Sequence, residues 1–378
     1  MKQTETLVVG ASVSGLALAA SLQKRGIEYI IVEKQSQIAS PWRHHYERLH
    51  LHTNKRLSHL PYKKFDSTIP RYPTRQQVVE YLEDYQKELN IDPVFNTEAK
   101  SIRKDNDYWE TETNNETFKS KYLVMATGAF GNPKPVSFEG METFPGAILH
   151  SCQYRSGADF KGLRVLVVGF GNSACEIAID LYEQGAIPFM SVRSPVNIIP
   201  REIAGIPIME LSLIMSRLPP RVADTIIAPL MRLIFGDITK LGLTKKPYGP
   251  FEEIKRDRTI PLLDIGTVKH IRQGHIKIYS GIGHIEGCTV HFSDGKREDF
   301  DVIVACIGFN RDNTKIIAVD NNRLKDLKVC VNQQKYFGKD GLYFCGFWIG
   351  PTGLIREIAK DAQKIARDIA EKESYSKI

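Results

Sequence analysis

The 378-residue sequence has few cysteines and no uninterrupted apolar run, and both absences restrict what the protein can be. Its six cysteines are widely separated and include no Cys-x-x-Cys pair, so we expect no disulfide framework, dithiol redox centre or zinc ribbon. The most apolar stretch, residues 203–238, is interrupted by charged residues and prolines, so we expect no transmembrane segment. No apolar secretory core is visible near the start, which leads us to expect a cytoplasmic protein.

Charge of one sign does not dominate either. Lys and Arg number 51 against 44 Asp and Glu, and the two signs are interspersed. A nucleic-acid partner is therefore not expected, because binding of this kind needs a clustered basic face. What is present, 42% hydrophobic and 25% charged residues, is typical of a globular protein, and the length suggests two or three domains.

Two segments share one pattern. Residues 6–33 and residues 163–193 each read as a buried strand, a Gly-rich turn, an apolar helix and a second strand. Each is therefore a predicted β-α-β unit, and the fold class is α/β with two Rossmann-like dinucleotide-binding domains.

The rest of the chain groups around these two units. We expect a helix at 75–89, a β-meander at 105–118, apolar strands ending in glycine at 121–128 and 299–308, a short strand at 341–346 and an amphipathic helix from about 353. One domain then contains both chain ends, residues 1–155 and 299–378. The other, residues 156–298, includes the helical segment 203–240.

The first Gly-rich turn, Gly10-Ala-Ser-Val-Ser-Gly15, follows a strand and begins a helix. Gly10 permits the tight turn, Gly15 permits close packing of helix on strand, and the helix N-terminus offers N–H groups to a pyrophosphate. Glu33 ends the second strand, about 20 residues on, where a carboxylate accepts ribose hydroxyls. Ser12 replaces the middle glycine, and its hydroxyl is a candidate phosphate donor. The alternative is a strand–helix turn without a ligand.

The second turn has the first two glycines, Gly169 and Gly171, followed by Asn172 and Ser173. Its second strand ends at Arg193 rather than at an acid, and Arg201 follows shortly. A guanidinium at this place suits the 2′-phosphate of NADPH, so we predict NADPH in preference to NADH. The alternative for Arg193 is a solvated charge at a strand end.

Two such sites suggest FAD reduced by NADPH. A third motif indicates which reaction the reduced flavin carries out. Phe144, Gly146, His150 and Tyr154 fit FxGxxxHxxx(Y/F), the fingerprint of class B flavin monooxygenases. A packing role between domains is the alternative for His150 and Tyr154.

Over nearly its whole length the sequence resembles the YUCCA-type flavin-containing monooxygenases. The blocks that carry the resemblance are Pro41-Trp42-Arg43, Tyr72-Pro-Thr-Arg75, Ala126-Thr127-Gly128, Gly171-Asn172-Ser173, Ile199-Pro-Arg201-Glu202, Pro261-Leu-Leu-Asp264 and Gly341-Leu-Tyr-Phe-Cys-Gly346. One departure is Cys306-Ile-Gly308-Phe309, where the family has Ala-Thr-Gly-Tyr.

The resemblance implies a fold of the flavin monooxygenase and glutathione reductase type, with FAD in residues 1–155 and 299–378 and NADPH (NADP+) in 156–298. It also implies a C4a-(hydro)peroxyflavin that transfers one oxygen atom to a small organic substrate. The remaining predicted cofactor-binding residues are Ser14, Lys34, Trp42, Arg43, Arg75, Thr127, Gly128, Gly308 and Gly346.

No protein nucleophile is expected, because the reactive oxygen belongs to the flavin. Many relatives place an Asn three residues before a Lys, beside the flavin. Here His52 stands at that position before Lys55, and Asn54 is displaced by two, so both are candidate catalytic residues, with loop packing as the alternative. The histidines around them match no metal-ligand spacing, and no metal is predicted.

The leading hypothesis is an FAD- and NADPH-dependent monooxygenase that uses O2 for S-oxidation, N-oxidation or oxidation of an activated carbonyl or 2-oxo acid such as indole-3-pyruvate. The alternatives are an NADPH oxidase or flavin reductase without oxygen transfer, and a non-catalytic flavoprotein. For the apolar segment 203–238 we expect a cover over the active-site mouth, with a peripheral membrane contact or a homodimer face as alternatives.

Overall fold

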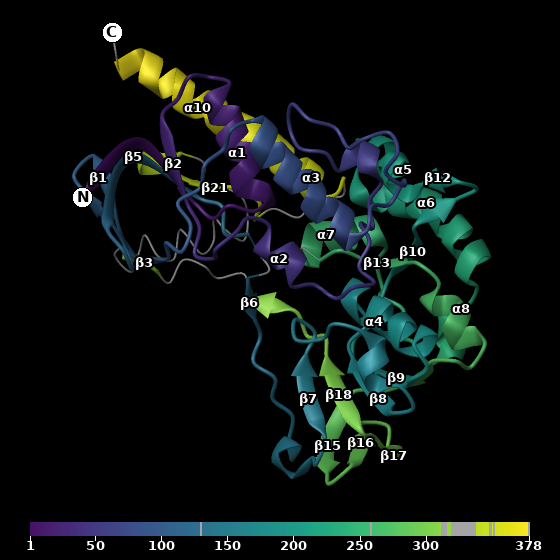
Figure 1. Cartoon of the computed structure of the whole chain (residues 1–378). Helices are drawn as coiled ribbons and strands as arrows, with labels where there is room; N and C mark the ends of the chain where they lie inside the picture. Colours follow the sequence, from purple (N-terminus) through teal and green to yellow (C-terminus); the bar gives the residue numbers. More distant parts are fainter. Residues whose placement is uncertain are drawn as a thin grey trace. The chain divides into compact units, whose positions relative to one another are not determined.

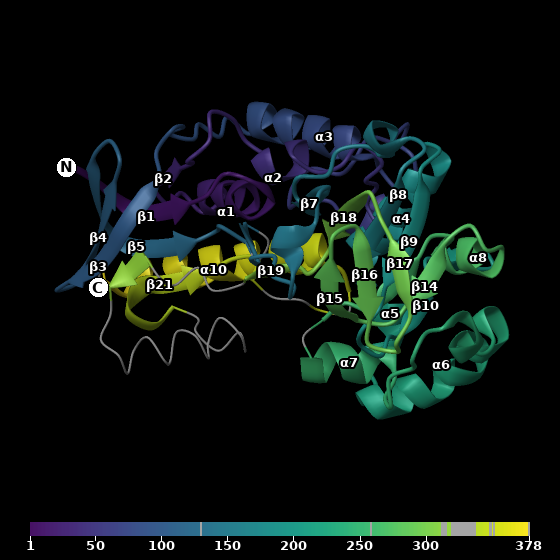
Figure 2. The ribbon, with the colours of Figure 1, turned by 90° about the horizontal axis from the view of Figure 1, so that it is seen from below.

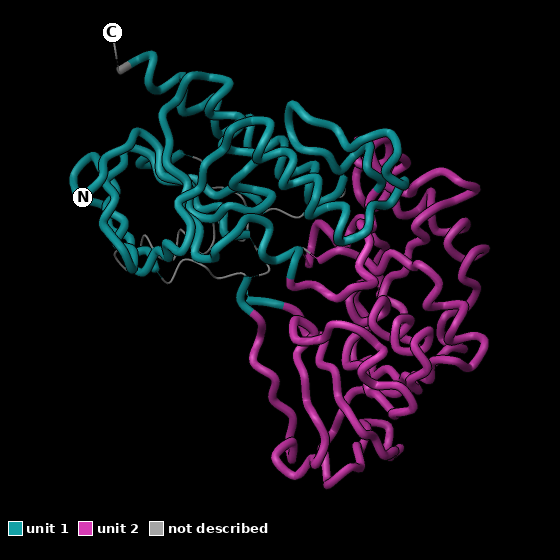
Figure 3. Tube along the Cα trace, in the orientation of Figure 1, with its two compact units in different colours: residues 1–43, 54–132, 309–378 teal, residues 44–53, 133–308 magenta. Residues whose placement is uncertain are grey.

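The computed structural model describes residues 1–128, 131–257, 259–310, 316–318, 338–347, 350 and 352–376. The chain forms two compact units, shown in different colours in Figure 3. Unit 1 contains Met1–Arg43, Asn54–Asn132 and Phe309–Ile378, and unit 2 contains His44–Thr53 and Pro133–Gly308. Both chain ends belong to unit 1. The unit boundaries differ from the predicted domain boundaries at residues 44–53, 133–155 and 299–308, which lie in unit 2, and the division by cofactor stays a prediction.

Unit 1 is built around a mixed sheet with strand order β2-β1-β5-β4-β3-β20, and β21 also pairs with β5. The strands are β1 (Lys2–Val9), β2 (Tyr29–Val32), β3 (Ala99–Asp105), β4 (Tyr108–Thr113), β5 (Thr117–Met125), β20 (Ile317–Ala318) and β21 (Leu342–Phe344). β1 is parallel to β2 and to β5, and its last residue, Val9, lies opposite Val32 and Met125. The loops that follow these three strands therefore begin at one edge of the sheet.

Helices complete unit 1: α1 (Val13–Gln23), α2 (Ser40–Arg43), α3 (Arg75–Glu88) and α10 (Leu354–Ser376). α1 is buried along nearly its whole length and lies beside α10 (Figures 1 and 2). The predicted apolar stripe of α10 is its packed face, since Ile358, Ala362, Ile365 and Ile369 are all buried. Pro351, in the turn predicted before this helix, lies outside the described residues.

One predicted boundary in unit 1 is wrong. The third strand of the meander and the apolar strand at 121–128 are a single strand, β5, that runs from Thr117 to Met125. Its first half alternates partly exposed and buried residues, where it pairs antiparallel with β4. Its second half is buried throughout, between the parallel neighbours β1 and β21. One strand thus changes from the alternating burial of an antiparallel pair to the continuous burial of a parallel core.

Unit 2 contains a parallel sheet with strand order β14-β9-β8-β18-β7. The strands are β7 (Ala147–His150), β8 (Arg164–Val168), β9 (Ile187–Ser191), β14 (Lys277–Tyr279) and β18 (Val302–Ala305). Helix α4 (Asn172–Glu183) connects β8 to β9 as the predicted crossover. Val168 lies opposite both Ser191 and Ala305, so the second Gly-rich turn, the segment toward Arg193 and Cys306 all begin at one sheet edge. An antiparallel sheet of β15 (Ile282–Glu286), β16 (Thr289–Phe292) and β17 (Arg297–Asp299) belongs to the same unit.

The remaining elements of unit 2 include the predicted helical segment. They are β10 (Ile198–Pro200), β11 (Glu202–Ile203), β12 (Ile206–Pro207), α5 (Ile208–Met215), α6 (Pro220–Phe235), α7 (Pro250–Asp257), β13 (Leu262–Asp264) and α8 (Thr267–Arg272). On α5 and α6 several large apolar side chains stay exposed: Ile214 is 64%, Ile226 56% and Leu233 82% exposed. In the described part of the chain, no helix is both long and apolar enough to cross a bilayer.

Candidate active site

The first Gly-rich turn, in unit 1, has the geometry of a phosphate-binding turn. Gly10 has a φ of +107°, and a Cβ added at Gly15 would lie 1.9 Å from the Gly10 carbonyl oxygen. Both positions therefore require glycine. Ser12 is the N-cap of α1, but its side chain makes no capping hydrogen bond and the first turn contains no acid. The N-terminus of α1 is thus suited to an anionic group.

Two neighbours support this turn. The Glu33 carboxylate is buried and accepts hydrogen bonds from the backbone N–H of Ala11 (2.8 Å) and of Gln35 (3.0 Å). Each carboxylate oxygen keeps capacity for a further bond, so ribose recognition by Glu33 fits the structure. Ser14 is buried against Gly346, where an added Cβ would lie 2.0 Å from the Ser14 hydroxyl oxygen. Packing explains why Gly346 is a glycine.

The other predicted FAD contacts of unit 1 lie around this edge or on α2 and α3. Arg43 donates to the Ile38 carbonyl (3.0 Å) and pairs with Glu83, while Arg75 donates to the Arg43 carbonyl (2.6 Å). The Arg75 Nε atom is buried without a hydrogen-bond partner among the described residues, as expected of a donor that binds a ligand.

Three further predicted FAD contacts are placed in unit 1. Gly128 has a φ of +70°. Lys34 is exposed, and Trp42 is half-buried.

The second turn, in unit 2, repeats the arrangement with one difference. Gly169 has a φ of +122°, and a Cβ there would lie 2.7 Å from the Cys306 carbonyl oxygen. At Gly171, the N-cap of α4, a Cβ would meet no atom of the described part of the chain within 4 Å. The Asn172 side chain accepts from the Leu263 N–H (2.8 Å) and so braces the turn. The open space at Gly171 is where a pyrophosphate approaches in this kind of turn.

Gly171→Ala tests that assignment. Because a Cβ contacts no described atom, we expect the variant to fold normally and to keep its melting temperature within about 2 °C. If the pyrophosphate of NADPH occupies the space, the KM for NADPH rises at least about 10-fold, the effect of roughly 1.4 kcal/mol of lost binding. The measurement is steady-state NADPH oxidation. An unchanged KM would place the pyrophosphate elsewhere.

The two predicted 2′-phosphate ligands differ in setting. Arg193 is exposed, two residues beyond β9, and its Cγ lies 3.1 Å from where a Cβ at Gly281 would be. Arg201 is half-buried, and its backbone pairs with Asp264 (3.3 Å) and Ile208 (3.0 Å). An exposed guanidinium can reach a phosphate without first losing a buried partner.

The residues of the monooxygenase fingerprint are packed inside unit 2. Phe144 belongs to its apolar core, and a Cβ at Gly146 would lie 2.0 Å from the Asp301 carbonyl oxygen. His150 accepts at Nδ1 from the Cys152 N–H (3.2 Å) and donates from Nε2 to the Gly308 carbonyl (3.1 Å). These contacts favour a structural role, in which His150 holds the Gly308 turn.

Tyr154 is buried as deeply. Its ring stacks on Phe160 with centroids 5.6 Å apart, and its hydroxyl donates to Asp180 (2.6 Å). Burial, and then this hydrogen bond to a carboxylate, raise the pKa of the Tyr154 hydroxyl far above its usual range. Tyr154 therefore stays neutral and serves packing within unit 2.

The two candidate catalytic residues have different surroundings. Asn54 is 1% exposed, and its Oδ1 accepts from the Leu57 N–H (3.0 Å) as the cap of a short 3-10 helix. His52 is partly exposed, and its Nε2 lies 3.1 Å from Glu176 Oε2. Of the two, His52 is the one whose side chain the structure leaves partly accessible.

Sequence reasoning missed Glu176. It lies on α4 between the buried residues Cys175 and Ile177 and is itself 1% exposed. The signal that could have identified it is an acidic residue in a helix that otherwise has to be buried. A buried carboxylate requires partners and so marks a site of interest.

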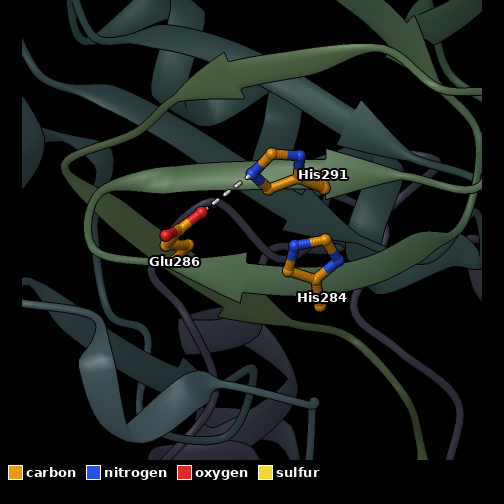
Figure 4. A group of neighbouring side chains, drawn as sticks. All are labelled: His284, Glu286 and His291. Carbon is orange, nitrogen blue, oxygen red and sulfur yellow. Dashed lines mark ion pairs between the residues drawn. The ribbon is translucent and has the colours of Figure 1, made fainter.

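A group of metal-ligand residue types lies elsewhere, on the β15–β16 hairpin (Figure 4). His284 and His291 face each other across the strands and Glu286 lies 3.7 Å from His291. The two imidazole rings stack 4.2 Å apart with an interplanar angle of 9°. Imidazole lone pairs lie in the ring plane, so those of parallel stacked rings cannot converge on one ion unless a ring rotates. We assign no metal site to this hairpin.

Comparison with known proteins agrees with this geometry. The family model described as pyridine nucleotide-disulphide oxidoreductase matches residues 7–197. The chain is 38% identical to the indole-3-pyruvate monooxygenase YUCCA6 of Arabidopsis thaliana, over 97% of this chain and 90% of that protein. It is 35% identical to the indole-3-pyruvate monooxygenase YUCCA1 of Oryza sativa subsp. japonica, over 96% and 90%.

Solved structures share the fold. Cyclohexanone monooxygenase bound to ε-caprolactone superimposes with a TM-score of 0.77 at 19% identity, over 100% of this chain and 89% of that chain. A flavin-containing monooxygenase from Stenotrophomonas maltophilia gives 0.72 at 16% identity, over 98% and 99%.

Two Rossmann-type dinucleotide turns in one chain define a flavoprotein that receives electrons from a pyridine nucleotide. Within that class the chain belongs to the YUCCA-type flavin-containing monooxygenases. It is an FAD- and NADPH-dependent enzyme that uses O2 on a small-molecule substrate. The predicted family, fold class, enzyme class and cofactors are confirmed.

Proposed function

We propose that this enzyme oxidatively decarboxylates a 2-oxo acid with an aromatic side chain, represented by indole-3-pyruvate. In the balanced reaction the 2-oxo acid, NADPH, O2 and a proton give the carboxylic acid one carbon shorter, CO2, NADP+ and water. The observation that carries the proposal is the identity of up to 38% to relatives named indole-3-pyruvate monooxygenases, which extends over 97% of the chain.

The structure supports a division of tasks among this chain's own residues. The α1 turn and Glu33 would hold the pyrophosphate and adenine ribose of FAD, with Arg75 Nε as a further donor. The α4 turn would hold the pyrophosphate of NADPH, and Arg193 and Arg201 its 2′-phosphate. When bound, FAD supplies the activation of oxygen. His52 would move a proton during the reaction, while Asn54 caps a 3-10 helix.

A second candidate follows from one observation. His52 stands where many relatives have Asn, and Asn54 is displaced from that position by two residues and caps a 3-10 helix, so the position itself carries no amide. If that amide is essential for oxygen transfer, the enzyme acts as an NADPH oxidase that releases hydrogen peroxide.

Product analysis under 18O2 separates the two functions. The FAD-loaded enzyme is incubated with NADPH and indole-3-pyruvate, and in parallel with thioethers, amines and ketones. We expect one 18O atom in the carboxylate of the shortened acid and close to one product per NADPH consumed. NADPH consumption matched by hydrogen peroxide, with no labelled product from any of the four classes, would support the oxidase.

The apolar residues exposed on α5 and α6 are the observation behind the remaining proposals for this chain. A cover over the active-site mouth, a homodimer interface and a peripheral membrane contact each make use of such a face. Together with the cytoplasmic location, they stay predictions.

A further inference from the structure

Three acidic residues lie on one face of α4. Glu176, Asp180 and Glu183 are separated by four and three residues, the spacing that brings helical side chains onto the same side. Glu176 is 1% and Asp180 4% exposed. Carboxylates buried to this degree persist only where donors surround them. Asp180 has two, the Tyr154 hydroxyl (2.6 Å) and the Gly157 N–H (2.8 Å).

The donors for Glu176 come from the segment His44–Thr53, which belongs to the same unit although unit 1 flanks it in sequence. The Tyr46 hydroxyl donates to Glu176 Oε2 (2.8 Å), and His52 Nε2 lies 3.1 Å from the same oxygen. Arg48 Nη1 is 3.8 Å from Oε1, and its Nε and Nη2 are bound to Glu183 (2.7 and 3.0 Å). One face of α4 therefore holds this segment at three points.

The charge of Glu176 follows from these contacts. Burial by itself raises the pKa of the Glu176 carboxyl, but the hydrogen bond and charge of His52, the hydrogen bond from Tyr46 and the charge of Arg48 outweigh burial and leave the pKa below its usual value. Glu176 is thus an anion at neutral pH. Because a carboxylate only accepts, His52 must carry its proton on Nε2, and in the neutral ring Nδ1 is the acceptor.

We propose that Glu176 is a positioning residue of this enzyme: its carboxylate holds His52 in the Nε2–H tautomer and orients the ring so that Nδ1 can take up and release a proton during the reaction. This inference rests on the proposed function, in which His52 moves a proton during the reaction. A carboxylate bonded to the far nitrogen of an imidazole fixes the tautomer and the orientation of the ring. Glu176 is suited to orienting His52 because both residues belong to unit 2.

The competing explanation is purely structural, with Glu176 as an anchor for the segment His44–Thr53. Asp180→Asn is the matched control, because Asp180 is one turn along the same face, is equally buried and bonds Tyr154 and Gly157 instead of His52. Glu176→Gln keeps the size and the acceptor oxygen but removes the charge. A structural role predicts similar effects for both variants.

The first measurement is spectroscopic and needs no substrate. In the FAD-loaded enzyme labelled with 15N-histidine, the Nε2–H proton of His52 should give a downfield signal, assigned by its loss in His52→Ala. We expect this signal to move upfield or to disappear through exchange with water in Glu176→Gln and to stay in Asp180→Asn. A signal that is the same in Glu176→Gln and in the wild type overturns the proposal.

The second measurement is a double-mutant cycle on the rate of product formation. We expect Glu176→Gln to lower the rate about 10-fold, as losing a carboxylate partner of a functional histidine does. In the His52→Ala background the same change should alter the rate less than about 2-fold, because Glu176 acts through His52. Equal losses in both backgrounds overturn the proposal.

The proposed function and the positioning role of Glu176 are contradicted by different results. If no substrate class yields labelled product, the proposed function is wrong, while the histidine signal still reports on the Glu176–His52 pair and NADPH oxidation provides a rate for the cycle. If the wild type forms product and Glu176→Gln forms it at the same rate, the positioning role alone is wrong.

Discussion

Gly15→Ala is expected to purify with less than about a tenth of the wild-type FAD content. A Cβ at Gly15 would lie 1.9 Å from the Gly10 carbonyl oxygen and 3.0 Å from Ile31 Cδ1. Gly10 cannot retreat, because its N–H is bound to the Val32 carbonyl (2.8 Å) and its own α-carbon faces the Ala126 carbonyl. Helix α1 must therefore shift away from β1, at a cost of about 1–3 kcal/mol or more, and its N-terminus leaves the turn.

The flavin-to-protein absorbance ratio measures this effect, and thermal unfolding shows whether the variant is folded. Gly131→Ala is the control, since a Cβ there approaches no atom of the described residues closer than 3.8 Å and the residue has no positive φ. A folded Gly15→Ala enzyme with full FAD content would mean that the first turn does not bind the FAD pyrophosphate.

Arg193→Ala is expected to lower kcat/KM for NADPH by about 10- to 100-fold and to change kcat/KM for NADH less than about 3-fold. The magnitude corresponds to roughly 1.5–3 kcal/mol for hydrogen bonds between a guanidinium and a phosphate, which NADH lacks. Arg193 is exposed, and truncating it leaves no buried acid unpaired among the described contacts, so little loss of stability accompanies the change.

The measurement is the steady-state kcat/KM of each variant with NADPH and with NADH. Arg217→Ala is the control for loss of positive charge, because Arg217 is an exposed arginine between α5 and α6. If the ratio of NADPH to NADH efficiency is the same in Arg193→Ala and in the wild type, the 2′-phosphate is bound by other residues. Arg201→Ala then becomes the next variant to measure.

Most secondary structure in the two β-α-β units could be predicted because local patterns determine it. The apolar strands before Gly10 and Gly169 and the helices after them begin within a few residues of the predicted positions. The single strand β5 could not be predicted in the same way. Its burial pattern changes midway, where β21 replaces the hairpin neighbour β4 as the second partner beside β1, and both β1 and β21 come from distant parts of the chain.

The candidate site shows the same limit. A motif indicates that Phe144, Gly146, His150 and Tyr154 matter, but whether they contact a ligand or the protein depends on what the fold brings to them. In the structure, the neighbours of these residues are Asp180, the Gly308 turn and the core of unit 2. Glu176 carries no motif, and only its partners Tyr46 and His52, more than 120 residues earlier, reveal why an acid occurs there.

By itself the sequence determined the class of this enzyme. The evidence for the class consists of glycine spacing, the charge at the end of each second strand and apolar periodicity, and each of these can be read from residues close together in the chain. Tertiary structure alone decided which polar groups have no partner among the residues that the structure describes, such as Arg75 Nε, and which are satisfied, such as Asn54 Oδ1. The physical reason is that hydrogen-bond satisfaction and burial are properties of atoms brought together from distant segments, and neither is encoded at any single position.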